Sequence, residues 1–137
     1  MLERNRVEVD NPAVTYVHGD IFEWASPQRY DTIFFGFWLS HVPPAAFDRF
    51  WHLVGSWLAP HGRVGFIDED ARAASNDETL LVDGVPMARR HLSDGRDVHI
   101  VKMFWNPEEL EARLRALGWD AAVRAVGEEY LFGTARA

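Results

Sequence analysis

The chain has 137 residues, a length that fits one globular domain and excludes two full catalytic domains. Its formal net charge of −7 has the wrong sign for a protein that follows a nucleic-acid backbone. It has no cysteine, which excludes disulfides, thiolate nucleophiles and zinc fingers. Because no apolar run approaches the ~18 residues of a membrane span and no signal-like apolar core precedes residue 10, we predict a cytoplasmic protein with no membrane and no nucleic-acid partner.

The first half of the chain predicts an arm, two strands and a helix. Charged residues up to Asp10-Asn11-Pro12 indicate the end of a helix or a loose arm. The β-branched and aromatic residues 14–17 predict a short strand, and the apolar residues 30–35 predict a strand covered on both faces in a parallel sheet. Apolar side chains recur at helical spacing over residues 45–58, which predicts an amphipathic helix with its tryptophans in the core.

The second half predicts a strand, a small excursion, a helix and a hairpin. Residues 63–67 predict a strand that runs into an acidic cluster, and residues 80–82 and 98–101 predict a small antiparallel excursion. Asn106-Pro107-Glu108-Glu109 has the cap, proline and acidic residues of a helix N-terminus, and a hairpin over residues 121–135 follows. This order predicts an α/β fold with a mostly parallel sheet that ends in an antiparallel hairpin.

Three phrases follow one another along the chain: Gly19-Asp20-Ile21-Phe22, then residues 30–42 with Leu39-Ser40-His41-Val42 at their end, then Leu58-Ala59-Pro60-His61-Gly62-Arg63-Val64. Together they resemble class I methyltransferases that use S-adenosylmethionine. In that family the matching pieces are the third strand with its terminal acid, the fourth strand with its acceptor-side loop, and the fifth strand. The final helix and hairpin are also similar to the family's last two strands, so the resemblance covers nearly the whole chain.

The chain departs from the family at one motif. Members begin with a strand and the loop G-x-G-x-G, which brings backbone N–H groups close to the cofactor, and the ten glycines here never form that pattern. The resemblance therefore implies a Rossmann-like methyltransferase sheet with the first two strands missing. Residues 1–137 are predicted to form a single, partial methyltransferase domain, with residues 69–105 as a substrate-side excursion.

The resemblance implies an enzyme that transfers a methyl group from S-adenosylmethionine to a small molecule, in the full-length form of the domain. The alternative is a catalytically inactive, methyltransferase-like module for binding or dimerisation. Without the glycine loop, we expect this chain alone to bind the cofactor weakly or not at all. We also expect homo-oligomers, because unpaired edges at residues 14–17 and 33–35 recruit other strands.

The resemblance implies a cofactor site and one catalytic residue. Cofactor contact is carried over onto Asp20, Ile21, Phe22, Gly36, Phe37 and Trp38, since the acid can accept from the adenine amine and aromatic faces attract a sulfonium. The alternatives are a solvated turn for Asp20 and core packing for Phe37 and Trp38. His41 matches the residue near the transfer site, where a histidine can act as a general base, and its alternative is a helix cap or a packing role.

Two further clusters receive the simpler interpretation. Asp68-Glu69-Asp70 is interpreted as solvated loop acids and not as a divalent-ion site, because three consecutive acids cannot all point one way. The histidines are scattered and we predict no metal. Arg89-Arg90-His91 is interpreted as a solvated face, with a grip on an acidic substrate as the alternative.

Overall fold

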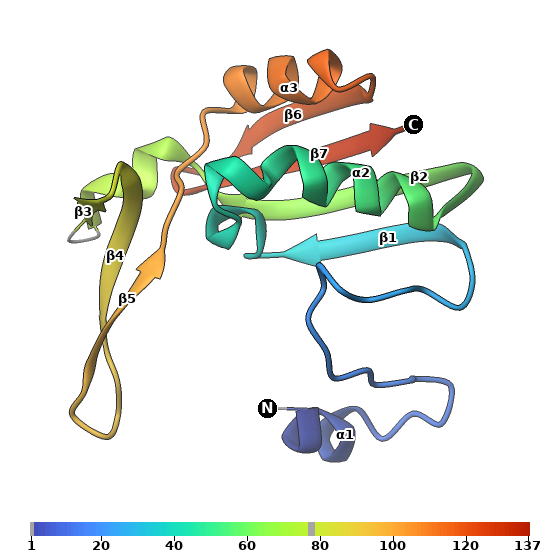
Figure 1. The fold of residues 1–137 in the computed structure, drawn as a ribbon, viewed down its shortest axis with the longest axis horizontal. Helices are drawn as coiled ribbons and strands as arrows, with labels where there is room; N and C mark the ends of the chain where they lie inside the picture. Colours follow the sequence, from blue (N-terminus) through green and yellow to red (C-terminus); the bar gives the residue numbers. More distant parts are fainter. Residues whose placement is uncertain (1, 77–78) are drawn as a thin grey trace.

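The structure is a computed structural model that describes residues 2–76 and 79–137. In chain order its helices and strands are α1 (Leu2–Val9), β1 (Tyr30–Gly36), α2 (Phe47–Trp57), β2 (Leu58–Glu69), β3 (Thr79–Val82), β4 (Val85–His91), β5 (Asp97–Val101), α3 (Pro107–Ala116), β6 (Asp120–Val126) and β7 (Tyr130–Arg136) (Figure 1). Short 3-10 turns span Leu39–His41, Pro44–Ala46 and Ala71–Asn76. None of the helices in the described ranges is long and apolar enough to cross a membrane.

The strands form two sheets. The larger has the order β1-β2-β7-β6, with β1 and β2 parallel and the other two pairings antiparallel. The smaller has the order β3-β4-β5 and is antiparallel throughout. The predicted C-terminal hairpin and the predicted excursion are therefore confirmed, whereas β4, in the middle of the smaller sheet, was not predicted. The prediction of a mostly parallel sheet is wrong, because two of the three pairings between strands of the larger sheet are antiparallel.

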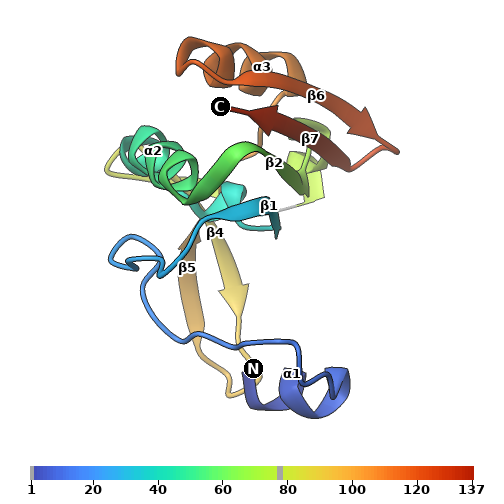
Figure 2. The same cartoon turned by 90° about the vertical axis from the view of Figure 1, so that its right-hand side faces the viewer.

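Helices α2 and α3 pack on one face of the larger sheet, as Figures 1 and 2 show together. The stripe of α2, which includes the fully buried Trp51, meets Phe66 of β2, and Leu110 and Leu114 of α3 join the same core. The predicted tryptophan core is confirmed. Helix α2 ends at Trp57 because the next residue, Leu58, is extended and already belongs to β2.

The prediction that the 30–35 strand is covered on both faces is wrong. Ile33 and Phe35 pack against the core, but the Phe34 side chain, which points to the other face, is 64% exposed. Strand β1 lies at the sheet edge, and no helix within residues 2–76 and 79–137 covers its outer face. The apolar sequence therefore predicted the strand correctly but did not predict what covers its two faces.

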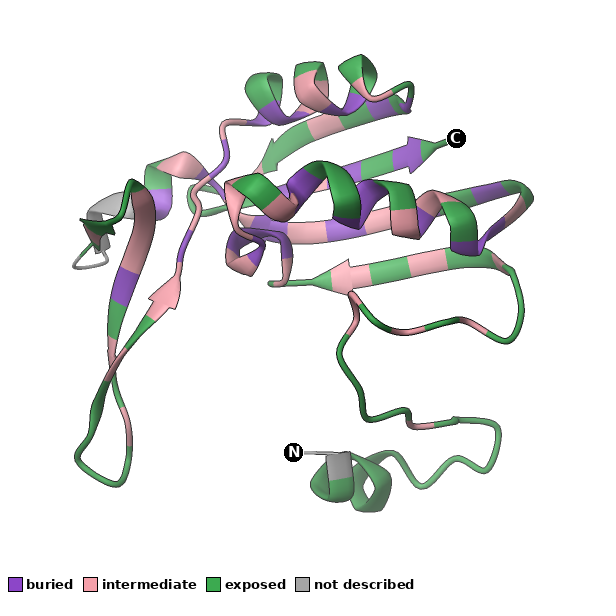
Figure 3. Cartoon of the chain, in the orientation of Figure 1, coloured by how far each residue is buried: buried purple, intermediate pink, exposed green. Residues whose placement is uncertain are grey.

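The predicted strand at residues 14–17 is also wrong. These residues have no regular secondary structure, and Val17 is 57% exposed. A strand exists only when another strand completes its ladder of hydrogen bonds, and the segment has no such neighbour among the described residues. It instead forms an exposed arm with α1, apart from the sheets (Figures 1 and 3), where the Tyr16 hydroxyl donates to the Asn5 carbonyl at 3.2 Å.

Candidate functional site

The parallel strands β1 and β2 end side by side, and their carboxyl edge is where ligands bind in open α/β sheets. Gly36, the last residue of β1, pairs with Ile67, so Asp68 and Glu69 extend β2 beyond the end of its neighbour. A Cβ added at Gly36 would lie 3.2 Å from Ile67 Cγ2, a tight contact. Glycine keeps the two strand ends close at this edge.

Phe37 turns the chain away from the sheet. Its φ of 53° lies in the left-handed region, which side chains other than glycine rarely adopt, and its N–H donates to the Ile67 carbonyl at 2.8 Å. The Phe37 ring is 50% exposed and meets the Tyr130 ring edge-on, with 5.9 Å between centroids. Core packing, the alternative interpretation of Phe37, is therefore wrong.

The rings of Trp38 and Phe22 both lie next to the ring of Phe50 in the core. Each has its ring centroid 6.3 Å from that of Phe50 in α2. The Trp38 ring is half-buried, and its indole N–H is buried without a hydrogen-bond acceptor among the residues that the structure describes. The indole N–H groups of Trp51 and Trp105 in the core are buried without an acceptor in the same way, so this feature alone does not distinguish Trp38 from a core residue.

Asp20 and Ile21 lie in the turn before Phe22. The Asp20 carboxylate accepts from the Phe22 N–H at 2.8 Å, and the side chain is exposed. Ile21 lines a hollow of about 730 Å³ between the arm and the start of β1. The turn that the alternative interpretation expected at Asp20 is thus present, and its exposed carboxylate is also open to a ligand.

His41 ends the 3-10 turn Leu39–His41, and its ring nitrogen Nδ1 lies 2.7 Å from the carbonyl oxygen of Val101. A carbonyl only accepts, so Nδ1 carries the hydrogen and Nε2 has the free lone pair. Capping is wrong as the alternative role, because neither the turn Pro44–Ala46 nor α2 has a side-chain cap. This bond favours the tautomer with the hydrogen on Nδ1, which leaves Nε2 able to accept a proton as a general base must.

The interpretation of the acidic cluster as solvated is wrong. Asp68 and Asp70 are buried at the end of β2, and Glu69 is partly buried. Asp68 accepts from the Ser40 N–H at 3.0 Å and from the Glu69 N–H at 2.8 Å, and Glu69 Oε2 pairs with Lys102 Nζ at 2.6 Å. The cluster is held by these specific partners because the strand continues into it.

Sequence reasoning missed Lys102, whose side chain is only 3% exposed. The sequence offers one indication that Lys102 is buried: this residue lies between the β-prone run 98–101 and the apolar Met103-Phe104-Trp105. A charged residue inside such an apolar stretch is buried only with a partner. The partner, Glu69, is far away in sequence and cannot be inferred from spacing.

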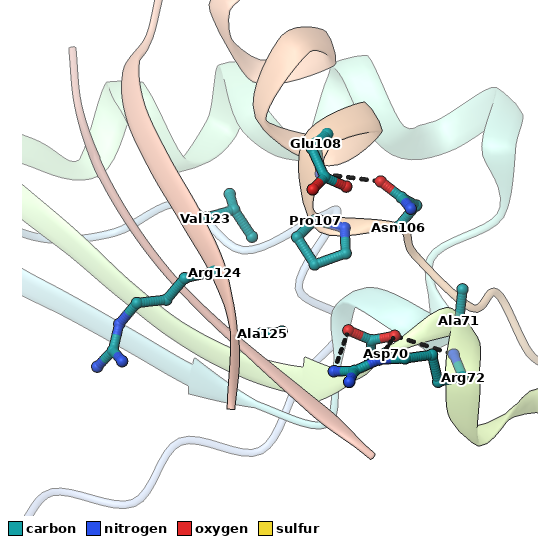
Figure 4. Close-up of a pocket in the computed structure, with 9 residues that line it drawn as sticks. All are labelled: Asp70, Ala71, Arg72, Asn106, Pro107, Glu108, Val123, Arg124 and Ala125. Atoms are coloured by element: carbon teal, nitrogen blue, oxygen red, sulfur yellow. Dashed lines mark hydrogen bonds and ion pairs between the residues drawn. The ribbon is translucent and has the colours of Figure 1, made fainter. Parts of the chain in front are cut away.

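Asp70 and Arg72 line a hollow of about 640 Å³ next to the start of α3 (Figure 4). The Arg72 guanidinium bonds both Asp70 oxygens, at 2.9 and 3.0 Å, and its hydrogen bonds hold the pKa of Asp70 below the ordinary value. The described residues contain no group of three or more acidic or histidine side chains that could hold a metal ion. This pair is an internal ion pair of the fold.

The basic run lies on β4 and faces β5. Arg89 and His91 are both exposed and both bond Asp97, whose pKa is lowered first by Arg89 and then by His91. Cross-strand ion pairs of this kind are typical of a solvated sheet face, as predicted. Nothing about the run requires an acidic substrate.

Comparison with solved structures identifies the architecture. The chain is similar to DhpI in a DhpI-SAM-HEP complex, with 38% identity over 99% of this chain and a TM-score of 0.82. It is also similar in fold to an S-adenosylmethionine-dependent methyltransferase from Clostridium acetobutylicum, with 12% identity over 97% of this chain and 68% of that one, and a TM-score of 0.69. The glycopeptide N-methyltransferase MtfA complexed with S-adenosyl-L-methionine gives 17% identity over 96% of this chain and 70% of MtfA, with a TM-score of 0.65.

The chain has the class I methyltransferase fold. The predicted Rossmann-like methyltransferase sheet with its C-terminal hairpin is confirmed, and no strand of that sheet lies before β1 in the part of the chain that the structure describes. The chain spans 63% of the length of DhpI in the SAM-HEP complex. No protein-family model and no curated protein matches the sequence.

Proposed function

We propose that this methyltransferase-fold domain transfers a methyl group from S-adenosylmethionine to a small molecule. The observation that carries the proposal is the similarity to DhpI over 99% of the chain, since that protein is complexed with SAM and HEP. The parallel pairing of β1 and β2 supports the proposal, because ligands of open α/β sheets bind at the carboxyl edge of such strands. The small-molecule acceptor is part of the same proposal.

The residues at this edge fit the cofactor. Phe37 and Trp38 follow the end of β1; the Phe37 ring is half exposed against Tyr130, and the Trp38 ring is half-buried against Phe50 of α2. We propose that these rings, with the backbone of Gly36, border the sulfonium, and that Asp20, Ile21 and Phe22 bind the adenine. When bound, the cofactor supplies an electrophilic methyl group. Aromatic faces stabilise the positive charge of a bound sulfonium and fix its position.

His41 is the proposed general base. An acceptor atom that carries a proton would have to lose that proton on receiving the methyl group. Nε2 of His41 is the receiving atom, because Nδ1 already donates to Val101 at 2.7 Å. Holding one tautomer avoids a rearrangement of the ring before each proton transfer.

Calorimetric titration of the purified 137-residue chain with S-adenosylmethionine and with S-adenosylhomocysteine tests the binding expectation. We expect weak or no binding, because the sequence lacks the glycine loop and each lost charge-assisted hydrogen bond is worth about 1.5–3 kcal/mol. A micromolar dissociation constant for a proven monomer contradicts this expectation.

The function itself is tested in a form that carries the glycine loop. The DNA upstream of Met1 shows whether an in-frame stretch encodes G-x-G-x-G, and the corresponding longer chain is the sample for a methyl-transfer assay with labelled S-adenosylmethionine. Failure of that chain to bind the cofactor overturns the proposed function and favours an inactive binding or dimerisation module.

A further inference from the structure

Two consecutive bonds tie the turn that contains His41 to the end of the small sheet. The Met103 N–H donates to the Ser40 carbonyl at 2.7 Å, and the His41 ring donates from Nδ1 to the Val101 carbonyl at 2.7 Å. The chain that leaves β5 therefore runs beside this turn, as Figure 1 also shows. His41 takes its orientation from a segment 60 residues away in sequence.

Lys102 lies between the two residues that make these bonds. Its side chain is buried and its ammonium pairs with Glu69, at the end of β2, at 2.6 Å. Its own N–H donates to Pro86 of β4 at 3.0 Å. The residue is thus bonded to the small sheet through its backbone and to the large sheet through its side chain.

From the other side, the same turn is held by β2. Asp68 is fully buried and accepts the Ser40 N–H at 3.0 Å. Asp68 and Glu69 are neighbours, so one strand end supplies both the anchor of Ser40 and the partner of Lys102. The peptide groups of Ser40 are therefore held between β2 and the segment after β5.

We infer that the Glu69–Lys102 ion pair is a positioning device for His41. It fixes the segment 101–103 against the end of β2, and that segment in turn holds the His41 ring in the Nδ1–H tautomer. Removing one partner of a buried ion pair leaves an uncompensated charge, so the segment should shift away from the turn. Lys102 and Glu69 are positioning residues in this inference and touch no reacting atom.

The inference rests on the proposed function for its meaning, but its test does not depend on activity. Lys102→Met removes the charge and keeps much of the side-chain length. Arg96→Met is the matched control, because Arg96 pairs with Asp94 in the exposed β4–β5 turn of the same sheet. The measurement is nitrogen-15 NMR of the His41 ring in the 137-residue chain at about pH 8, where an ordinary imidazole is neutral, together with hydrogen exchange of the Met103 amide.

We expect Nδ1–H to dominate in the native chain and in Arg96→Met. In Lys102→Met the Nε2–H tautomer should become substantially populated, and the Met103 amide should exchange about tenfold faster or more, as expected when a buried partner is lost. A folded Lys102→Met chain with the native His41 spectrum and native exchange overturns the inference.

Glu69→Gln keeps the test decisive if Lys102→Met does not fold. The amide retains the size of the side chain and can still accept from Lys102, so we expect a smaller change of the same kind at His41. An unchanged His41 spectrum in a folded Glu69→Gln chain also overturns the inference. Because these readouts need no cofactor, they can fail while methyl transfer stands, and methyl transfer can fail while they succeed.

Discussion

Phe66 and Gly133 face each other across β2 and β7 at paired positions. A Cβ built on Gly133 would lie 2.0 Å from Phe66 Cζ, well inside any real contact. The Phe66 ring cannot move away easily, because it stacks on Phe35 at 5.6 Å and meets Trp51 edge-on at 5.7 Å. The Phe66 ring therefore fills the space that a side chain at position 133 would occupy.

Gly133→Ala should destabilise the fold by about 2 kcal/mol or more, since overpacking a rigid core forces backbone and side chains to shift. Urea unfolding measures the change. Gly65→Ala is the control in the same sheet, where the nearest side-chain atom to an added Cβ is Phe34 Cδ2 at 3.4 Å. We expect a change within ~0.5 kcal/mol there. Equal stability of both variants would show that Phe66 can be displaced without cost.

The Asp70–Arg72 pair should make stability depend on pH in the acid range. Hydrogen bonds from Arg72 lower the pKa of Asp70 in the folded chain, so the folded state binds fewer protons than the unfolded state. The stabilisation is fully present above the unfolded pKa of ~3.9 and is lost as the pH falls through the lowered folded pKa.

Arg72→Met tests this dependence through urea midpoints at neutral and acid pH. We expect the variant to be less stable than the native chain at neutral pH. The difference in stability between the two should become smaller at acid pH. Arg96→Met, which breaks an exposed pair with Asp94, should open a smaller gap because solvent screens that pair. A gap for Arg72→Met that stays constant with pH would contradict the assignment.

The exposed edge of β1 should drive self-association. Phe34 is 64% exposed on an edge strand, and edge strands with apolar side chains pair with other chains. Phe34→Lys should shift the sedimentation profile toward monomer. The control is Val7→Lys, which changes an exposed apolar residue of the helix α1, where there is no strand edge, and should leave the profile unchanged. A native chain that sediments as a monomer at every concentration contradicts the prediction.

His41→Ala and His41→Gln distinguish a general base from a structural residue. A base predicts that turnover falls by ~100-fold or more in both variants while cofactor affinity holds. The samples are forms that carry the glycine loop. If His41 serves only to bond Val101, the amide of glutamine can donate in its place, and His41→Gln should largely recover turnover.

Local sequence patterns determined most of the elements. The apolar spacing of α2 and the cap at Asn106, which accepts from the Glu108 and Glu109 N–H groups, act within one or two helical turns. The three ordered phrases also predicted the methyltransferase sheet, since two of them contain β1 and the start of β2. Such features can be predicted because the interacting residues are close in sequence.

The tertiary structure alone decided which elements are covered and which side chains meet. Within residues 2–76 and 79–137, residues 14–17 have strand composition but no neighbouring strand, and Phe34 lies on a face without a helix. The bond from His41 to Val101 and the pair Glu69–Lys102 join distant segments. Burial and pairing depend on what the rest of the chain places alongside a residue, and a local pattern of apolar and charged letters does not contain that information.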